Sequence, residues 1–388
     1  MNEKARHKRA YSILRVLATP FFKWKFNYQF PIVDSVEGPY IVLANHNSDL
    51  DGPLVGLAFP KQMYFVVSEH ITRMGILSWF IMRYIKPIIR VKGKVEVKTV
   101  SEILRTVRGG DNVCIFAEGA RSFNGQTRPI LPSTGKMVKR SGAALITYRL
   151  EGGYFSQPRW GTTFRRGKVT GAVAGFYTAE ELKAMTEEQV NEIIKTDLFE
   201  DAYETQKRER IPFKGKKLAF GMESTLFLCP NCNKIGTLKS DDTSISCECG
   251  LHYTYTKYGD LEAKDGEIYS ITEWDLWQQK ELTNRFLQWK DADIETPCLS
   301  DKITLLDINN DHQIVAQEEG SMVAYLDRLE CCGHTFYFEE MLGFDIVSRN
   351  RIIMNYGKDA HHYEMKGDIG FNALKYLYFY QLVKGVEI

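Results

Sequence analysis

The chain has 388 residues and a formal net charge of +1, and 44 % of its residues are hydrophobic and 26 % are charged. These values exclude a chain that is disordered throughout and one that binds polyanions through its overall charge. The length allows two or three domains.

The first thirty residues are basic and aromatic. They hold seven lysine and arginine residues against a single acidic residue, Glu3. Residues 10–30 begin as an amphipathic helix, which Pro20 should end or kink. Phenylalanine and tryptophan then alternate with Lys23 and Lys25, a pattern that suits the headgroup boundary of a membrane. A helix packed on its own domain would give the same pattern. We expect residues 1–32 to form an amphipathic segment on a phospholipid membrane surface.

Neither a signal-peptide pattern nor a run of about 18 apolar residues occurs near the N-terminus. The most apolar stretch, residues 74–89, is interrupted by Arg83 and Lys86. We therefore expect a peripheral protein at the cytoplasmic face of the cell membrane. In that compartment the eight cysteines are thiols or metal ligands rather than disulfides.

Apolar strand-like runs alternate with helix-like patterns in the first half of the chain. The strands are predicted at 40–44, 63–67, 113–116 and 144–148, and the helices at 53–58, 74–84 and 97–107. This alternation predicts an α/β core with a mostly parallel sheet and flanking helices. A capping box at Thr186 and Gln189 predicts a helix that ends near Tyr203. We place this domain at residues 33–215 and read its basic end, residues 207–217, as a linker.

The last third of the chain changes character. Residues 273–290 look helical, and residues 302–365 read as short strands with turns at Asn309-Asn310 and Arg349-Asn350. A final helix is predicted over 371–383. Residues 261–388 therefore predict a helical connector and a small β-rich domain, whose pattern suits a barrel of the pleckstrin-homology kind.

A histidine and an aspartate lie five positions apart where the strand at 40–44 ends. His46 could act as a general base because the ordinary pKa of histidine lies near neutral pH, and Asp51 could fix its tautomer. The segment Asp51-Gly52-Pro53 also resembles a helix start, with Asp51 as the N-cap and Pro53 in the first turn. On spacing alone, a structural histidine and a simple helix cap are the commoner explanation.

A second polar segment follows the strand at 113–116. Gly119 permits a sharp turn and a close approach of backbone N–H groups to an anion. Arg121 can bind a phosphate through two N–H bonds, and Glu118 can pair with Arg121 or hold a hydroxyl group of glycerol. A surface ion pair at a strand end is the alternative.

Taken together, the two segments resemble the 1-acylglycerol-3-phosphate acyltransferase family, within the wider glycerophospholipid acyltransferase group. Its members carry N-H-x-x-x-x-D and, further on, F-P-E-G-T-R-S. The first motif is matched by Asn45, His46 and Asp51, and the second by Phe116, Glu118, Gly119, Arg121 and Ser122. Ala117 and Ala120 replace the proline and threonine of the second motif. The resemblance covers roughly residues 10–205.

Other family motifs match less closely. Arg90, at the end of Lys86–Arg90, corresponds to an arginine that faces the phosphate in the family. Residues 133–136 lack the usual Phe-Lys-Lys-Gly form, and the apolar run at 144–148 lacks the usual proline. The resemblance therefore leaves the acyl-chain length and the headgroup of the substrate open.

The resemblance implies an O-acyltransferase with His46 and Asp51 as catalytic residues. It also implies that five residues bind the phosphate and glycerol of the substrate: Arg90, Glu118, Gly119, Arg121 and Ser122. The acyl donor would be acyl-CoA, an acyl carrier protein thioester or an acyl phosphate. The acceptor would be a lysophospholipid, first of all 1-acylglycerol 3-phosphate, which yields phosphatidic acid in phospholipid biosynthesis. Two alternatives are acylation of glycerol 3-phosphate or another lyso-lipid, and a catalytically silent lipid-binding adaptor with a zinc ribbon.

Two close cysteine pairs lie further along the chain. Cys229 and Cys232 are followed, after fourteen residues, by Cys247 and Cys249. Four thiolates at this spacing can hold one Zn²⁺ tetrahedrally, with no position left for a reactive water, so the ion would be structural. Such a zinc ribbon, at residues 222–260, is too small to fold without its metal. Its few exposed aromatic residues and scattered lysines favour a protein or interdomain contact over nucleic acid.

Overall fold

The structure is a computed structural model that describes residues 3–73, 75–90, 97–264, 268–291, 294–309, 313–386 and 388. Met74, the first residue of a predicted helix, and Asn310, in a predicted turn, lie outside the described residues. The chain divides into two compact units. One is built largely from the residues up to Gly215, and the other from residues 160–162 and 216–388.

The first unit is built on a seven-stranded sheet with the strand order β1-β7-β6-β2-β5-β3-β4. The strands are β1 (Tyr28–Gln29), β2 (Tyr40–Ala44), β3 (Met63–Ser68), β4 (Ile88–Arg90), β5 (Asn112–Phe116), β6 (Ala144–Glu151) and β7 (Val169–Tyr177). Neighbouring strands pair in parallel, except β6 and β7, which are antiparallel. The predicted α/β core with a mostly parallel sheet is confirmed.

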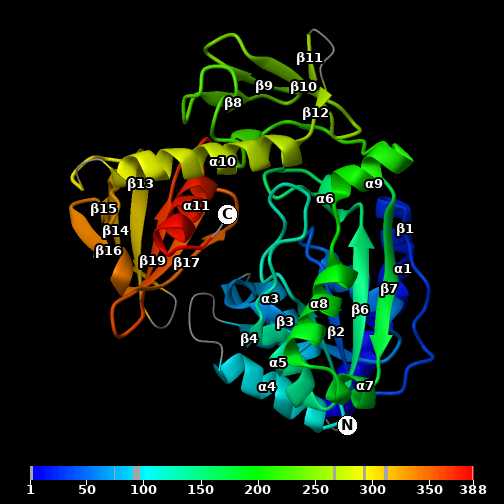
Figure 1. The fold of residues 1–388 in the computed structure, drawn as a ribbon. Coiled ribbons are helices and arrows are strands. Elements are labelled where there is room, and N and C mark those ends of the chain that lie inside the picture. Colours follow the sequence, from blue (N-terminus) through cyan, green and yellow to red (C-terminus); the bar gives the residue numbers. More distant parts are fainter. Residues whose placement is uncertain are drawn as a thin grey trace. The chain divides into compact units, whose positions relative to one another are not determined.

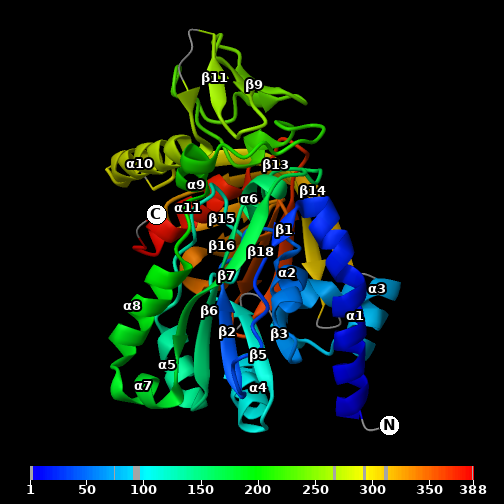
Figure 2. The ribbon, with the colours of Figure 1, turned by 90° about the vertical axis from the view of Figure 1, so that its right-hand side faces the viewer.

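Helices cover both faces of this sheet (Figures 1 and 2). On one face lie α1 (Glu3–Phe26) and α2 (Asp51–Ala58), and on the other lie α4 (Val97–Arg108), α5 (Ser133–Ser141) and α8 (Glu187–Leu198). The unit also contains the 3₁₀ helix η1 (Glu69–Arg73), α3 (Ile76–Tyr84), α6 (Gly153–Ser156), α7 (Ala179–Ala184) and α9 (Ala202–Glu209).

Strand β2 lies at the centre of the sheet and is fully buried. Val42 and Ala44 pack into the hydrophobic cluster under α1 and α2, and Ile41 and Leu43 pack into the cluster under α4, α5 and α8. Successive side chains of a strand point to opposite faces, so a strand covered on both faces must be apolar throughout. The sequence Tyr-Ile-Val-Leu-Ala meets that requirement, and it fixes the position of the loop that follows.

Pro20 does not end the first helix, which was one of the two outcomes predicted for it. α1 runs without interruption from Glu3 to Phe26 with Pro20 inside it. A proline within a helix costs about 3 kcal/mol. The helix continues because Phe22 and Phe26, which follow Pro20, are buried in the core beneath α1. None of the helices in the part of the chain that the structure describes is long and apolar enough to cross a membrane.

Two further helix boundaries differ from the predictions. Leu50, and not Asp51, is the N-cap of α2, because the Asp51 carboxylate turns back to the preceding loop. The capping box of Thr186 and Gln189 is present at the start of α8. However, α8 ends at Leu198, and a new helix, α9, starts at Ala202, so the predicted continuous helix to Tyr203 is wrong.

The second unit contains two antiparallel sheets. The first comprises β8 (Leu238–Ser240), β9 (Ser244–Cys247), β10 (His252–Tyr255), β11 (Leu261–Ala263) and β12 (Ile268–Tyr269), preceded by the 3₁₀ helix η2 (Met222–Ser224). The second comprises β13 (Leu299–Ile308), β14 (Ile314–Ala324), β15 (Arg328–Cys331), β16 (His334–Tyr337), β17 (Met341–Val347), β18 (Arg351–Tyr356) and β19 (His361–Lys366).

The described residues of the second unit also form the helices α10 (Ile271–Lys290) and α11 (Ala373–Val383) and the 3₁₀ helix η3 (Phe338–Glu340). The two helices are those predicted over 273–290 and 371–383. The seven-stranded antiparallel sheet confirms that the C-terminal region is β-rich.

Candidate active site

The two sequence motifs meet at the carboxyl ends of β2 and β5. Ala44 pairs with Phe116 in parallel register, so the loops that follow these residues leave the sheet side by side. His46 and Glu118 each lie two residues beyond this pair, and the His46 backbone N–H donates to Glu118 Oε1 at 2.6 Å. The carboxyl ends of parallel strands are where α/β proteins usually bind their ligands.

The Asp51 carboxylate is held by four donors and is fully buried. Oδ2 lies 2.9 Å from His46 Nδ1 and accepts the backbone N–H groups of Asn47 at 2.6 Å and Ser48 at 2.9 Å. Oδ1 accepts the Ser48 hydroxyl at 2.6 Å. These bonds fix the orientation of the carboxylate and therefore the orientation of the imidazole that it contacts.

The imidazole of His46 lies between this carboxylate and the aromatic ring of Phe116. The two rings are stacked with their centroids 4.6 Å apart, and 23 % of the His46 side chain is exposed. Because Asp51 accepts the proton on Nδ1, Nε2 is the nitrogen left to bind another partner. A partly exposed imidazole with its tautomer fixed can accept a proton from a hydroxyl group.

Glu118 is buried and accepts two backbone N–H groups. Its Oε1 binds His46 N and its Oε2 binds Arg128 N, both at 2.6 Å. Burial raises the pKa of Glu118 to about 8, against the two N–H donors, which lower it. Glu118 thus joins the two motif loops, whereas the sequence suggested a contact with Arg121 or with substrate.

A sharp turn at Gly119 brings two arginines to the same loop. Gly119 has φ of +70°, and a β-carbon at this position would collide with Arg90 Nη1, so the Arg90 guanidinium lies against the turn. Arg121 Nε lies 3.2 Å from Asp49 Oδ1. Its Nη1 atom is buried and has no hydrogen-bond partner among the described residues. The arrangement suits an anion at the turn.

Ser122 stabilises the same loop through hydrogen bonds of its backbone N–H and its hydroxyl. It is fully buried, its N–H donates to His46 O at 2.9 Å, and its hydroxyl donates to Gln126 O at 2.6 Å. Its hydroxyl also accepts the Gly125 N–H at 2.9 Å. Ser122 is therefore near the other motif residues, but its hydroxyl is engaged within the loop.

Two arginines near the site have no place in the sequence motifs. The guanidinium carbons of Arg128 and Arg159 lie 4.9 and 4.1 Å from the centroid of the Phe123 ring. Arg159 Nη1 also donates to Arg121 O at 3.0 Å. Arg159 follows β6 in the chain, and no local pattern links it to the motif at 118–122.

The sequence patterns also did not predict that Glu200 lies at the site. It lies between α8 and α9, and its carboxylate accepts the side-chain amides of Asn45 and Asn47, the two neighbours of His46. Because a continuous helix was predicted through residue 200, nothing in the sequence placed this carboxylate near the first motif.

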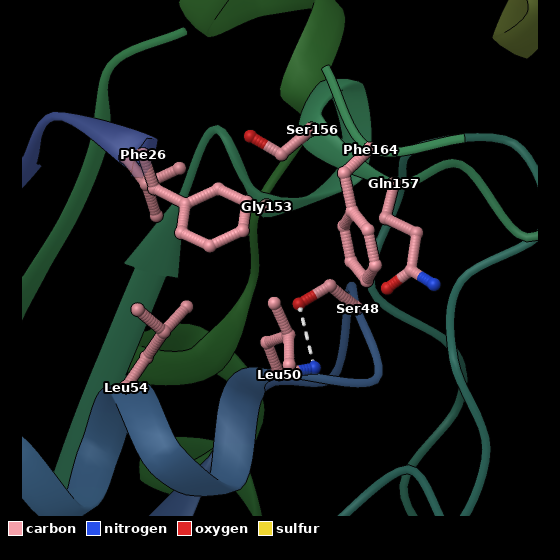
Figure 3. Close-up of a pocket in the computed structure, with 9 residues that line it drawn as sticks. Phe26, Ser48, Leu50, Leu54, Gly153, Ser156, Gln157 and Phe164 are labelled. Atoms are coloured by element: carbon pink, nitrogen blue, oxygen red, sulfur yellow. Dashed lines mark hydrogen bonds between the residues drawn. The ribbon is translucent and has the colours of Figure 1, made fainter. Parts of the chain in front are cut away.

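A small cavity adjoins the Asp51 loop (Figure 3). Figure 3 shows the side chains of Phe26, Leu50 and Phe164 around it, with the Ser48 hydroxyl at its edge accepting the Leu50 N–H at 3.2 Å. Its volume of about 10 Å³ is room for about one water molecule. In this conformation the cavity does not accommodate an acyl chain.

In the second unit, the four predicted cysteines converge. The Sγ atoms of Cys229, Cys232, Cys247 and Cys249 lie within 4.8 Å of one another and could hold a metal ion. Cys229 and Cys249 are 3.6 Å apart, and Cys232 and Cys247 are 3.7 Å apart. Hydrogen bonds from the Leu251 backbone and the Asn231 amide lower the pKa of Cys249 to about 6, which favours the thiolate that a metal needs.

Comparison with known proteins finds a similar family for part of the first unit. Residues 25–151 match the family described as Acyltransferase, and this segment spans β1 to β6 with both motif loops. Among solved structures, the chain is similar to the 1-acyl-sn-glycerophosphate (LPA) acyltransferase PlsC from Thermotoga maritima. The two are 22 % identical, the match covers 51 % of this chain and 81 % of that chain, and the TM-score is 0.42.

The raised pKa of Glu118 predicts a pH-dependent effect of the Glu118→Gln substitution. Between pH 4.5 and 8 the folded chain keeps the Glu118 proton while the unfolded chain releases it. The unfolded state then binds fewer protons, so the free energy of unfolding falls as the pH rises. The glutamine cannot titrate. As the pH rises, the free energy of unfolding of the wild type should therefore fall relative to that of the variant, by at most about 1.4 kcal/mol per pH unit.

Urea unfolding at several pH values between 5 and 8 measures this difference. Glu192→Gln is the control, because it makes the same change at an exposed position of α8. A constant difference for Glu118→Gln would mean that the Glu118 carboxyl is already ionised in the folded chain.

Proposed function

We propose that this chain is an O-acyltransferase that moves a fatty acyl group from a thioester to the free hydroxyl of a lysophospholipid. One observation carries the proposal: a histidine held by a buried aspartate lies beside an arginine-bearing turn, inside the segment that matches the acyltransferase family. The specific substrate we propose is 1-acylglycerol 3-phosphate, which would be converted to phosphatidic acid.

His46 would act as the general base in this reaction. As the substrate hydroxyl attacks the thioester carbonyl, its proton passes to His46 Nε2, and Asp51 stabilises the imidazolium through Nδ1. The C–O bond forms, the C–S bond of the tetrahedral intermediate breaks, and the leaving thiolate takes the proton from His46. Backbone N–H groups near the site would stabilise the oxyanion. Every atom is accounted for without a covalent enzyme intermediate.

The arginines at the Gly119 turn would bind the phosphate of the acceptor. Arg121 brings a buried nitrogen without a partner among the described residues, and Arg90 lies against the turn. A guanidinium binds phosphate through two parallel N–H bonds, so it orients the acceptor as well as attracting it. We propose that Glu118 and Ser122 act indirectly, by holding the turn beside His46.

The proposed reaction has alternative acyl donors and acceptors. Acyl-CoA and an acyl carrier protein thioester both supply the carbonyl and the leaving thiol. Glycerol 3-phosphate and other lyso-lipids share the phosphate and hydroxyl groups that the residues would recognise. A lipid-binding adaptor without catalysis is the alternative of another class.

Replacing His46 by alanine should slow the reaction strongly while leaving the fold intact. Without the base, transfer should slow by about 10²- to 10⁴-fold. A labelled acyl donor, supplied as acyl-CoA or acyl carrier protein thioester, should be tested with lysophosphatidic acid, glycerol 3-phosphate and lysophosphatidylcholine as acceptors.

His252→Ala is the matched control, because His252 is exposed on β10 of the second unit. Wild-type activity in the His46→Ala variant would remove His46 from the mechanism. Transfer by the wild type to none of the acceptors, from either donor, would favour the adaptor.

We also propose that the first unit binds the membrane surface peripherally, at the cytoplasmic face. One face of α1 exposes apolar side chains at a helical spacing, namely Ile13, Leu17, Phe21 and Trp24. The neighbouring helix α3 exposes Ile76 and Trp79, and Figure 2 shows the two helices side by side. Such apolar surface suits insertion at the headgroup boundary.

A groove on α1 adds charge to this surface. It has a volume of about 450 Å³ and combines Arg15 and Lys23 with the apolar side chains of Val16, Phe30 and Ile32. Cations beside apolar groups match a phospholipid, whose phosphate lies next to its acyl chains. The groove supports attraction to anionic lipid.

The double substitution Leu17→Glu/Trp24→Glu should weaken binding to vesicles of phosphatidylglycerol and phosphatidylcholine. The two side chains are 68 % and 63 % exposed, so the charges should spare the fold but oppose insertion. Sedimentation with vesicles should show a loss of at least about tenfold in the partition coefficient.

The control Leu276→Glu/Leu287→Glu adds the same charge at comparably exposed leucines of α10. It should bind as the wild type does. An equal loss in both variants would attribute the effect to charge alone and remove α1 from the membrane contact.

We propose that the four cysteines hold a structural Zn²⁺. A tetrahedral site with Zn–S bonds of about 2.3 Å has sulfur atoms about 3.8 Å apart. The separations of 3.6 and 3.7 Å fit this geometry. Four thiolates fill the coordination shell, so the ion would stabilise the small sheet β8–β12 and take no part in acyl transfer.

Metal analysis of the purified chain should find one zinc ion per chain, and Cys232→Ser should lower the zinc content several-fold because it removes one of four ligands. Cys298→Ser changes a cysteine outside the cluster and should keep the zinc. Wild-type protein purified without chelator that contains no zinc would contradict the assignment.

A further inference from the structure

Glu200 is a buried carboxylate that touches both neighbours of His46. Only 3 % of the residue is exposed. Its Oε2 accepts the side-chain amide of Asn45 at 3.0 Å and that of Asn47, and its Oε1 accepts the Gly152 N–H at 3.3 Å. A single side chain thus binds the residue before and the residue after the candidate base.

The two asparagines are held by β6 as well as by Glu200. Asn45 Nδ2 donates to Leu150 O at 2.8 Å, and Asn45 Oδ1 accepts the Leu150 N–H at 2.7 Å. Asn47 Nδ2 donates to Leu150 O at 3.3 Å. The side chain of Asn45 therefore pairs with the backbone of β6 as a strand would, and Glu200 binds the same side-chain amide.

Glu200 is also joined to the arginine-bearing loop. Its N–H donates to Thr127 Oγ1 at 2.8 Å, and its carbonyl accepts the Thr127 N–H at 3.0 Å. Thr127 precedes Arg128, whose N–H binds Glu118. Glu200 thus contacts the loop of His46, the end of β6 and the loop of Arg121.

We propose that Glu200 is a positioning residue for acyl transfer, which holds the His46 loop through Asn45 and Asn47. This inference rests on the proposed function. Glu200 acts on the reaction only through these asparagines and contacts no reacting atom. It lies beyond residue 151, where the match to the acyltransferase family ends, so it belongs to the part of this chain outside that match.

The chemistry of the contact explains why a long side chain with an acceptor oxygen is needed here. Oε2 receives two amide donors at once, which requires an oxygen with two available lone pairs. Burial raises the pKa of Glu200 well above its ordinary value, and the Asn47 and Gly152 donors partly oppose this. Removal of the side chain would leave two buried amide groups without this acceptor, a cost that should loosen the loop.

The test compares Glu200→Ala with Glu200→Gln in the full-length chain. Because the displaced group is the base, Glu200→Ala should lower kcat by about 10²-fold, as misplacement of a reacting group by about 1 Å does. KM for lysophosphatidic acid and for the acyl thioester should change less than about threefold, since the Gly119 turn keeps its own contacts. Glu200→Gln keeps one oxygen for both amides and should restore most of kcat.

Hydrogen–deuterium exchange provides a readout that needs no activity. The Asn47 and Ser48 amides bind Asp51, so peptides that cover residues 44–50 should exchange at least about tenfold faster in Glu200→Ala. Glu209→Ala is the matched control, because it removes a glutamate of the same unit that pairs with Lys168 at 2.8 Å. It should leave kcat and exchange at residues 44–50 unchanged.

The results distinguish the positioning role of Glu200 from the proposed acyl transfer. A fall in kcat with stable KM, rescue by Glu200→Gln and faster exchange at residues 44–50 support positioning. Unchanged exchange at residues 44–50, or equal losses in the alanine and glutamine variants, would overturn it. If the wild type transfers no acyl group, the proposed function fails, and the exchange experiment still decides whether Glu200 holds the loop.

Discussion

The parallel pairing of β2 with β5 places Ala44 opposite Phe116, and the other contacts of the candidate site follow from that register. Two residues further on, the His46 N–H binds the Glu118 carboxylate, and the same two loops meet again where the Ser122 N–H binds His46 O. A shift of one residue in the register would turn these side chains to the opposite face of the sheet. The 3.2 Å hydrogen bond from the first backbone N–H of β2 to the first side chain of β5 opposes that shift.

Sequence patterns were sufficient for the features that depend on neighbouring residues. The apolar runs predicted the strands of the parallel sheet, and the motif residues come together because they follow two adjacent strands. The proximity of His46 Nδ1 to Asp51 could be foreseen, because both residues lie in one short loop. Two close pairs, Cys229 with Cys232 and Cys247 with Cys249, likewise located the cysteine cluster.

What could not be foreseen depends on packing between distant segments. Pro20 is tolerated in α1 because Phe22 and Phe26 bury beyond it, which no local propensity expresses. Glu200 is brought to Asn45 across 155 positions of sequence, and only the end of α8 at Leu198 makes this possible. Arg159 reaches the loop of Arg121 in the same way. For such residues the sequence holds no periodic signal, because their partners are set by the completed fold.

Gly119 has a consequence for how this site can change in evolution. Its left-handed backbone conformation disfavours every other residue type, and the space where a β-carbon would stand is taken by the Arg90 guanidinium. Two independent constraints therefore act on one position. The guanidinium is the far end of a flexible side chain, so a β-carbon at 119 would push this cation away from the turn and would still leave the backbone strained. The arginine can therefore keep its place against the turn only while residue 119 is glycine.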